Sequence, residues 1–229
     1  MNKAIVCAIL AAAAGSAFAG SVSQMVIRGS FNGWSDAGQV VMTEVNPDVW
    51  YGVISGLGAN GNVEFKATTE DWSYNGPSSN IQTRANAAGD LEVYAYTQDF
   101  ADGWLPGAGP RVGYVNNVAN WEVMGSFNGW STAVASFTDV GGGIMRAVVD
   151  NLTAGSYEFK ARGMDDWSVT VGDGFGSTGA NMFATVADGE DIEILLDLEG
   201  GRYQINLIPT PAGLAVLGLG GLVGTRRRR

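Results

Sequence analysis

A seven-residue stretch occurs twice in this chain, and its tryptophan is well suited to ligand binding. Residues 29–35 read Gly-Ser-Phe-Asn-Gly-Trp-Ser, and the same residues return at 125–131, 96 positions later. The Asn-Gly pair favours a turn because both residues tolerate positive φ. A strand that ends at the first glycine would place Trp34 and Trp130 at the outer edge of this turn. A flat indole held there can stack on the face of a sugar ring.

Two alternating stretches would carry a basic side chain toward solvent. Residues 63–67 read Val-Glu-Phe-Lys-Ala, and residues 157–161 read Tyr-Glu-Phe-Lys-Ala. Successive side chains of a β-strand point to opposite faces of the sheet. The phenylalanine of each stretch therefore faces the core, and Lys66 and Lys160 face outward, where they can donate hydrogen bonds to sugar hydroxyls.

A second pair of tryptophans follows these stretches in both copies. Asp-Trp-Ser occurs at residues 71–73 and again at 166–168. An acidic residue before the tryptophan and a serine after it are typical of an exposed loop. We therefore expect Trp72 and Trp167 to lie on the surface near the lysines.

The elements that position these residues are short strands. No long segment shows the 3.6-residue period of a helix, and clusters of glycine, proline and asparagine separate the alternating runs. The two copies are offset by 94 to 96 positions throughout. This spacing predicts an all-β protein of two tandem antiparallel sandwiches, at 24–99 and 114–208, joined by a short, fairly stiff linker at 100–113.

The N-terminal end has the layout of an export signal. Residues 1–19 hold Lys3, then an apolar run at 4–14, then Ala-Phe-Ala at 17–19. A charged start, a short apolar centre and a small-x-small site predict a secretory signal peptide that is cleaved after Ala19. The mature protein is therefore expected to be secreted.

The C-terminal end, 209–229, holds Pro-Thr-Pro, an apolar run at 212–224 and four arginines at 226–229. The run is shorter than the ~20 residues that span a bilayer with confidence, and the arginines would orient it. The layout resembles the PEP-CTERM sorting signal of Gram-negative bacteria, with Pro-Thr-Pro in place of Pro-Glu-Pro. The resemblance implies a short hydrophobic helix in transient membrane contact, an exosortase partner, and delivery to the cell surface, outer membrane or exopolysaccharide layer. A plain C-terminal anchor is the alternative.

Composition excludes several classes of function. Five of the 13 basic residues, Lys3 and Arg226 to Arg229, lie in the end segments, which leaves eight basic against 23 acidic residues, a net charge of −15. A body so acidic cannot bind nucleic acid through its phosphates. The chain has no histidine, and its one cysteine, Cys7, lies in the predicted leader. We expect no catalysis, metal site or cofactor.

Together these motifs resemble the glycogen- and starch-binding E-set modules, which are immunoglobulin-like sandwiches that accompany pullulanases and glucan branching enzymes. The resemblance covers both copies and rests on Gly-Ser-Phe-Asn-Gly-Trp, on Glu-Phe-Lys and on the Asp-Trp that follows. It implies that the first tryptophan, the lysine and the second tryptophan form a sugar-binding surface that an asparagine often completes. By this resemblance the α-glucan-binding residues are Trp34, Lys66, Trp72 and Asn80 in one copy, and Trp130, Lys160, Trp167 and Asn181 in the other.

Structural roles remain possible for each of these residues. The turn tryptophans can plug the sandwich edge, the later tryptophans can pack under their loops, and the lysines can be solvated strand residues. We assign Trp50 and Trp121 to the core, because methionines replace them in the other copy. Trp104 has no counterpart and is a candidate for packing between the copies.

Two hypotheses of function follow. In the first, the protein binds α-glucan or a related polysaccharide without catalysis, and two copies could add avidity on one polymer. In the second, it is a structural or adhesive surface protein that uses the same fold for protein contacts. Buried Trp34 and Trp72 would favour the second hypothesis.

Overall fold

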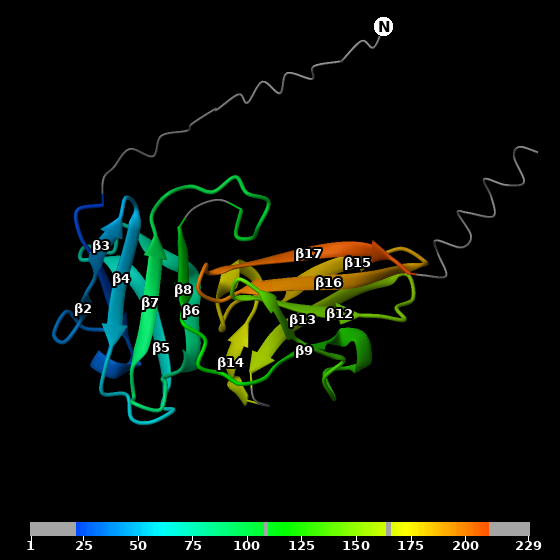
Figure 1. Ribbon diagram of the computed structural model, residues 1–229, viewed down its shortest axis with the longest axis horizontal. Helices are drawn as coiled ribbons and strands as arrows, with labels where there is room; N and C mark the ends of the chain where they lie inside the picture. The colour runs from blue at the N-terminus through cyan, green and yellow to red at the C-terminus, as the bar shows by residue number, and fades with distance from the viewer. Residues whose placement is uncertain (1–21, 108–109, 164–165, 211–229) are drawn as a thin grey trace, which may run out of the picture.

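The computed structural model describes residues 22–107, 110–163 and 166–210 (Figure 1). Strands dominate this part of the chain, which confirms the prediction of an all-β protein. Its helical elements are short 3-10 turns, η1 (Ser30–Asn32), η2 (Ser126–Asn128) and η3 (Asp173–Phe175). Within the described ranges no helix has the length and apolarity needed to cross a membrane. The predicted signal peptide and residues 211–229 of the predicted sorting tail lie outside them.

One nine-stranded antiparallel sheet runs through both copies. Its strand order is β10-β9-β13-β14-β6-β5-β1-β2, and β15 pairs with β13 off this path. The first copy supplies β1 (Met25–Gly29), β2 (Val40–Val41), β5 (Asn62–Thr69) and β6 (Asn75–Arg84). The second supplies β9 (Trp121–Gly125), β10 (Ala135–Ser136), β13 (Gly155–Gly163), β14 (Asp166–Val171) and β15 (Met182–Val186).

Two four-stranded antiparallel sheets cover the inner face of the long sheet, one over each half, and give the molecule a sandwich-like form (Figure 1). The sheet of the first copy contains β3 (Thr43–Asn46), β4 (Val49–Ile54), β7 (Leu91–Tyr96) and β8 (Arg111–Tyr114). The sheet of the second contains β11 (Thr138–Gly141), β12 (Ile144–Val149), β16 (Glu190–Asp197) and β17 (Arg202–Pro209).

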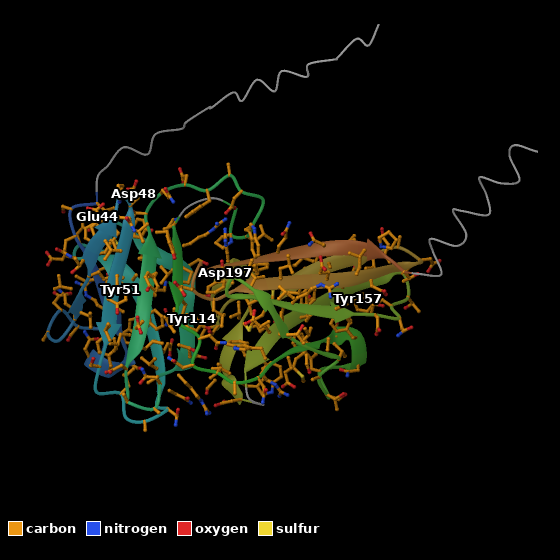
Figure 2. All side chains as sticks on the ribbon, in the orientation of Figure 1. Glu44, Asp48, Tyr51, Tyr114, Tyr157 and Asp197 are labelled. Atoms are coloured by element: carbon orange, nitrogen blue, oxygen red, sulfur yellow. The ribbon has the colours of Figure 1, made fainter. Side chains whose placement is uncertain are left out.

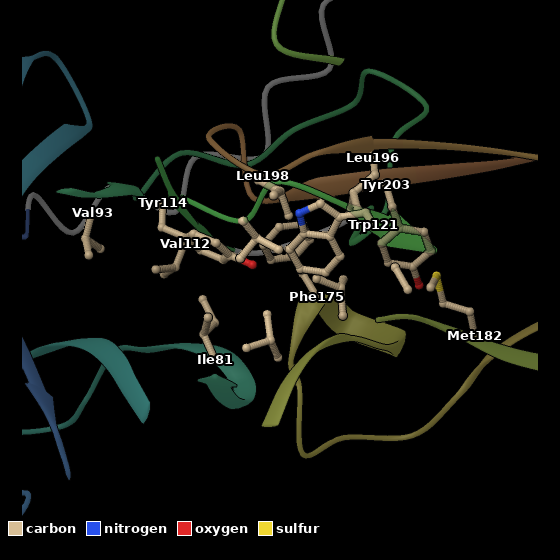
Figure 3. Close-up of a cluster of buried hydrophobic side chains, with 14 of the residues drawn as sticks. Ile81, Val93, Val112, Tyr114, Trp121, Phe175, Met182, Leu196, Leu198 and Tyr203 are labelled. Atoms are coloured by element: carbon tan, nitrogen blue, oxygen red, sulfur yellow. The ribbon is translucent and has the colours of Figure 1, made fainter. Parts of the chain in front are cut away.

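The buried side chains of the two copies form one continuous apolar cluster. Tyr114 of β8 links the halves, because its ring lies 6.4 Å from Phe65 of the first copy and 6.4 Å from Phe175 of the second. Figure 3 shows Tyr114 and Phe175 within this group of side chains. Trp50 and Trp121 are 5% and 2% exposed, as predicted from their methionine counterparts.

The repeated stretch forms the same turn in each copy. The strand β1 ends at Gly29, where a Cβ atom would collide with the carbonyl oxygen of Glu64. One 3-10 turn follows, and Gly33 takes a left-handed φ of +62°. The N–H of Trp34 then donates to the carbonyl of Gly29 (3.0 Å), which closes the turn in the manner of a Schellman cap.

Asn32 stabilises this turn differently from the Asn-Gly prediction. It lies in the 3-10 turn, and the left-handed residues are Gly33 and Trp34. Its Oδ1 accepts from the N–H of Gly29 (3.1 Å), and its Nδ2 donates to the carbonyl of Ser35 (2.8 Å). The asparagine is therefore needed for its side-chain hydrogen bonds, which fold the chain back behind the tryptophan.

The segment expected as a linker is packed against both copies. Residues 111–113 belong to β8, which pairs with β7. Asp102 accepts hydrogen bonds from Arg111 (2.7 Å) and from Arg202 of the second copy (3.0 Å), and the guanidinium of Arg202 lies 4.6 Å from the ring centre of Trp104. Leu105 exchanges backbone hydrogen bonds with Tyr203 of β17 (2.7 and 2.8 Å). Trp104 therefore packs on the second copy.

Candidate functional site

In the first copy, an exposed indole lies over a buried guanidinium. Trp72 is 40% exposed, in the turn between β5 and β6, and the Arg28 guanidinium carbon lies 4.9 Å from its ring centre. Arg28 itself is fully buried. It donates to the Thr68 hydroxyl (2.8 Å) and to the carboxylate of Asp36 (2.7 Å). Because Asp36 follows Trp34 by two residues, this ion pair folds the loop after Trp34 back toward Trp72.

The second copy repeats this arrangement with an arginine from a different strand. Trp167 is 47% exposed, and the guanidinium carbon of Arg162 lies 4.9 Å from its ring centre. Arg162 is held in turn by Glu122 (2.6 Å). The ring centres of Trp130 and Trp167 lie 6.0 Å apart, with the planes inclined by 51°. Trp167 lies within β14, not in the loop that the sequence predicted. It has no direct partner on β13, because the pairing register shifts between Arg162 and Gly163.

The turn tryptophans are partly buried, and both have left-handed backbones, with φ of +62° at Trp34 and +64° at Trp130. Trp72 has the same conformation, with φ of +61°. Bulky side chains rarely adopt this region, and strained backbone of this kind concentrates at functional sites. The fold therefore fixes the directions of these three indoles.

The two lysines face outward as predicted, but their ammonium groups also bind neighbouring protein groups. Lys66 Nζ donates to the carbonyl of Ser78 (2.9 Å) and to Asn75 Oδ1 (3.3 Å). Lys160 Nζ donates to the carbonyls of Ser177 and Gly179 (2.9 and 3.1 Å). Partial burial lowers the pKa of both lysines. An ammonium group has three N–H donors. Within the part of the chain that the structure describes, each lysine uses two of them, so one donor remains for a ligand.

The two asparagines occupy equivalent places. Asn80 Nδ2 donates to a carboxylate oxygen of Glu64, and Asn181 Nδ2 donates to Glu158 (2.9 Å). Both glutamates directly precede the phenylalanine of the Glu-Phe-Lys strand. Each copy therefore presents a fixed amide and carboxylate beside its lysine, a set that can both donate to and accept from hydroxyl groups.

The lysines, the glutamates and the arginines under the indoles lie on the outer face of the long sheet, the face turned away from the two smaller sheets. Directly paired residues of neighbouring strands point to the same face. An unbroken row of such pairs crosses both copies, namely Glu64, Gln82, Thr170, Arg162 and Glu122. Arg28 pairs with Lys66, two residues along from Glu64. We call Arg28, Trp34, Lys66 and Trp72 the first platform, and Trp130, Lys160, Arg162 and Trp167 the second platform.

The arginines under the indoles were not predicted from the sequence. A signal for them existed, since Arg28 directly precedes the repeated stretch and Arg162 follows Ala161 in the outward-facing phase of its strand. They occupy different strands of the two copies, so comparing the copies does not reveal them. Their shared position under the second tryptophan is visible only in three dimensions.

A separate hollow of about 290 Å³ lies where the two smaller sheets meet. Tyr96 and Phe100 of the first copy line it together with Asp197 and Arg202 of the second. Figure 2 shows Asp197 near the centre of the molecule. Its two arginines are already paired, because Arg202 donates to Asp197 (2.8 Å) and Arg111 donates to Asp102 (2.7 Å), so the hollow offers a ligand fewer free donors than the platforms do.

No protein-family model matches this chain, and no curated protein matches it. The geometry of the outer face and the repeated motifs therefore carry the functional argument.

Proposed function

We propose that this protein binds α-glucan or a related polysaccharide on its outer sheet face, without catalysis. The observation that carries the proposal is the repeated pair of exposed indoles, Trp72 and Trp167, each lying over an arginine beside an outward lysine. The faces of exposed indoles suit the apolar faces of sugar rings, and the neighbouring polar groups suit hydroxyls. The exposure of Trp72 favours this function over the adhesive alternative.

We further propose that the two copies are immunoglobulin-like E-set modules in an exported protein. The tail would bring it to the cell surface or the exopolysaccharide layer through an exosortase-type machinery. The three antiparallel sheets and the sandwich-like packing support the first part. An acidic body, in which every described arginine is already paired with a carboxylate, suits a neutral polymer better than a polyanion.

The expected affinity is modest. Stacking one indole on a sugar ring buries roughly 150 Å² of apolar surface, worth about 4 kcal/mol before the cost of ordering. Each platform should therefore bind a short oligosaccharide with a Kd in the millimolar range, on the order of 1 mM. The arginine under each indole reduces the ordering cost, because it holds the ring in place before the sugar arrives.

The test is a titration of tryptophan fluorescence with maltoheptaose, together with glycogen and starch affinity gels. The parent protein should give a saturable change and retarded mobility, and the double variant Trp72→Ala, Trp167→Ala should lose both. Trp104→Ala is the matched control, since Trp104 also stacks on an arginine but lies away from the outer face. If no glucan changes the fluorescence or the mobility of the parent, the adhesive function replaces this proposal.

A further inference from the structure

The two platforms share one face of one sheet, but equivalent strands that carry them run in opposite directions. Lys66 lies on β5 and Lys160 on its counterpart β13. From β5 to β13 the chain direction reverses three times, because β5 pairs antiparallel with β6, β6 with β14, and β14 with β13. Three reversals leave β5 and β13 antiparallel.

The distance between the platforms follows from the same pairing. Neighbouring strands lie about 4.8 Å apart, so β5 and β13 are separated by roughly 14 Å across the sheet. Lys66 lies two residues after Glu64, and Lys160 lies two residues before Arg162. Because the strands are opposed, both lysines lie on the same side of the row that joins Glu64 to Arg162. The two lysines thus lie at the same height along the strand direction, whereas their own strands, β5 and β13, run in opposite directions.

The space between the lysines is filled by protein. Lys66 holds the carbonyl of Ser78, and Lys160 holds the carbonyl of Ser177. The N–H of Ser177 donates to the carbonyl of Asn80 (2.8 Å), which joins β6 to the loop that contains Ser177. A ligand therefore meets two surfaces separated by this contact.

The orientation of the platforms is fixed by a seam between the copies. The hydroxyl of Ser177 accepts from the N–H of Gln82 (2.7 Å), and Arg84 forms an ion pair with Asp166 (2.6 Å). The continuous core lies beneath this seam. The copies cannot rotate to align their platforms without breaking these contacts.

A glucan chain has a direction, from its non-reducing to its reducing end. Equivalent platforms on opposed strands take chain segments of opposed direction. Sheet twist adds about 20–25° per strand, or roughly 60–75° over three steps, so the two segments also cross. A single extended segment cannot lie on both platforms in the same way.

We propose that the protein holds two separate polysaccharide segments, one on each platform, and thereby cross-links glucan chains. This inference rests on the proposed function. It replaces the expectation of avidity on one chain, which requires that both sites reach the same segment.

The experiment compares maltotriose with a linear maltodextrin of about 20 glucose units. The lysine-bearing strands of the two platforms lie roughly 14 Å apart, so maltotriose is too short to occupy both platforms at once and the maltodextrin is long enough. Calorimetric titration should give two ligands per protein in both cases, with Kd values that agree within about twofold. The variants Trp72→Ala and Trp167→Ala should each bind one ligand. Mixed with long amylose, the parent should raise light scattering to a maximum at intermediate protein concentration, and neither single variant should do so.

Two other results would overturn the inference, and they are distinguishable. One maltodextrin per protein, with affinity more than about tenfold above that for maltotriose, would mean that one chain occupies both platforms. This result would leave the proposed function intact. If no glucan bound at all, the proposed function would fail and the inference with it.

Discussion

Three tryptophans of the platforms have left-handed backbone conformations. A side chain with a Cβ atom in this region costs about 1–2 kcal/mol, because Cβ approaches the following carbonyl oxygen. Trp34 and Trp130 have nearly the same φ in the two copies, +62° and +64°. The turn tolerates this cost because the closing hydrogen bond to Gly29 or Gly125 (3.0 and 2.9 Å) requires the conformation.

The glycines of the repeated turn should differ in their tolerance of a methyl group. Gly33→Ala should destabilise the protein by about 1–2 kcal/mol, since the added Cβ atom meets no other atom and only the left-handed φ opposes it. Gly29→Ala should cost about 3 kcal/mol, because its Cβ atom would collide with the Glu64 carbonyl. Urea unfolding measures both. Equal effects would contradict the described turn.

A carboxylate at the seam should make stability sensitive to acid. The backbone N–H and hydroxyl of Ser168 and the guanidinium of Arg84 lower the pKa of Asp166 from 3.8 to about 2. Its contribution is therefore fully present above about pH 4 and is lost as the pH falls through about 2. Asp166→Asn should destabilise the protein at neutral pH, and the difference from the parent should shrink as the pH falls below about 4.

The control for this prediction is Asp150→Asn, since Asp150 is exposed and lies away from the seam. The same urea unfolding series on this variant gives the effect of removing one exposed carboxylate. A difference for Asp166→Asn that stays constant across the pH range would show that Asp166 does not titrate as described.

At the scale of elements, one buried hydroxyl group stabilises the seam between β6 and β14. The hydroxyl of Ser177 accepts from the N–H of Gln82, and its single O–H lies within hydrogen-bond distance of the carbonyls of Thr170 and Gln82. Ser177→Ala should leave these groups unpaired and cost about 1–3 kcal/mol.

Thr178→Ala, at the exposed neighbouring position, is the matched control and should change stability by less than about 0.5 kcal/mol. Hydrogen exchange should show where the loss falls. The amide of Gln82 should exchange faster in the Ser177 variant than in the parent, and its exchange rate should be unchanged in the control. If the two variants behaved alike, the hydroxyl would not hold the seam.

The sequence predicted the strands better than their partners. Alternation correctly placed Phe65 and Phe159 in the core and both lysines outside, because burial on one face of a strand imposes a period of two residues. The pairing of β6 with β14 was not predicted, since it depends on backbone hydrogen bonds at two sheet edges that leave no periodic trace. The loop at 172–181, which divides the counterpart of β6 into β14 and β15, also lay outside the prediction.

For the site, the sequence predicted that Trp72 is exposed but not that Trp167 lies in a strand. It predicted outward lysines but not the carbonyls they hold, because Ser78 lies at an irregularity in the pairing of β5 with β6 and Ser177 lies in the loop at 172–181. The two asparagines are separated by 101 positions, whereas the other repeated motifs are separated by about 95. Only the carboxylate partner of each asparagine shows that the two positions are equivalent.

At the scale of the whole molecule, one core implies one unfolding transition. Residues of both copies share a continuous apolar cluster, and Tyr114 packs between Phe65 and Phe175. We expect residues 22–210 to unfold cooperatively, with equal calorimetric and van't Hoff enthalpies. Two resolved calorimetric peaks would mean that the copies are independent domains.

Backbone atoms also pack closely at the second contact between the copies, where β8 meets the turn between β16 and β17. A Cβ atom at Gly113 of β8 would collide with the carbonyls of Leu198 and Glu199 in the turn between β16 and β17. Gly113→Ala should lower the free energy of unfolding by about 3 kcal/mol and could separate the single transition into two. Gly107→Ala, where the added Cβ atom would make only ordinary contacts at 3.9 Å with Leu105 and Trp104, is the control and should have little effect.

The pairing of β6 with β14 has a consequence for any attempt to isolate one copy. A fragment ending after β8 would expose the edge of β6 that pairs with β14 at Gln82, beside the apolar surface that Phe175 now covers. Unpaired edges of this kind recruit other strands. Because β14 is the second copy's counterpart to the beginning of β6, the nearest substitute for it is β6 of another fragment. The isolated copy should therefore associate into a two-fold symmetric dimer, in which two polypeptides rebuild the sheet that this chain completes within itself.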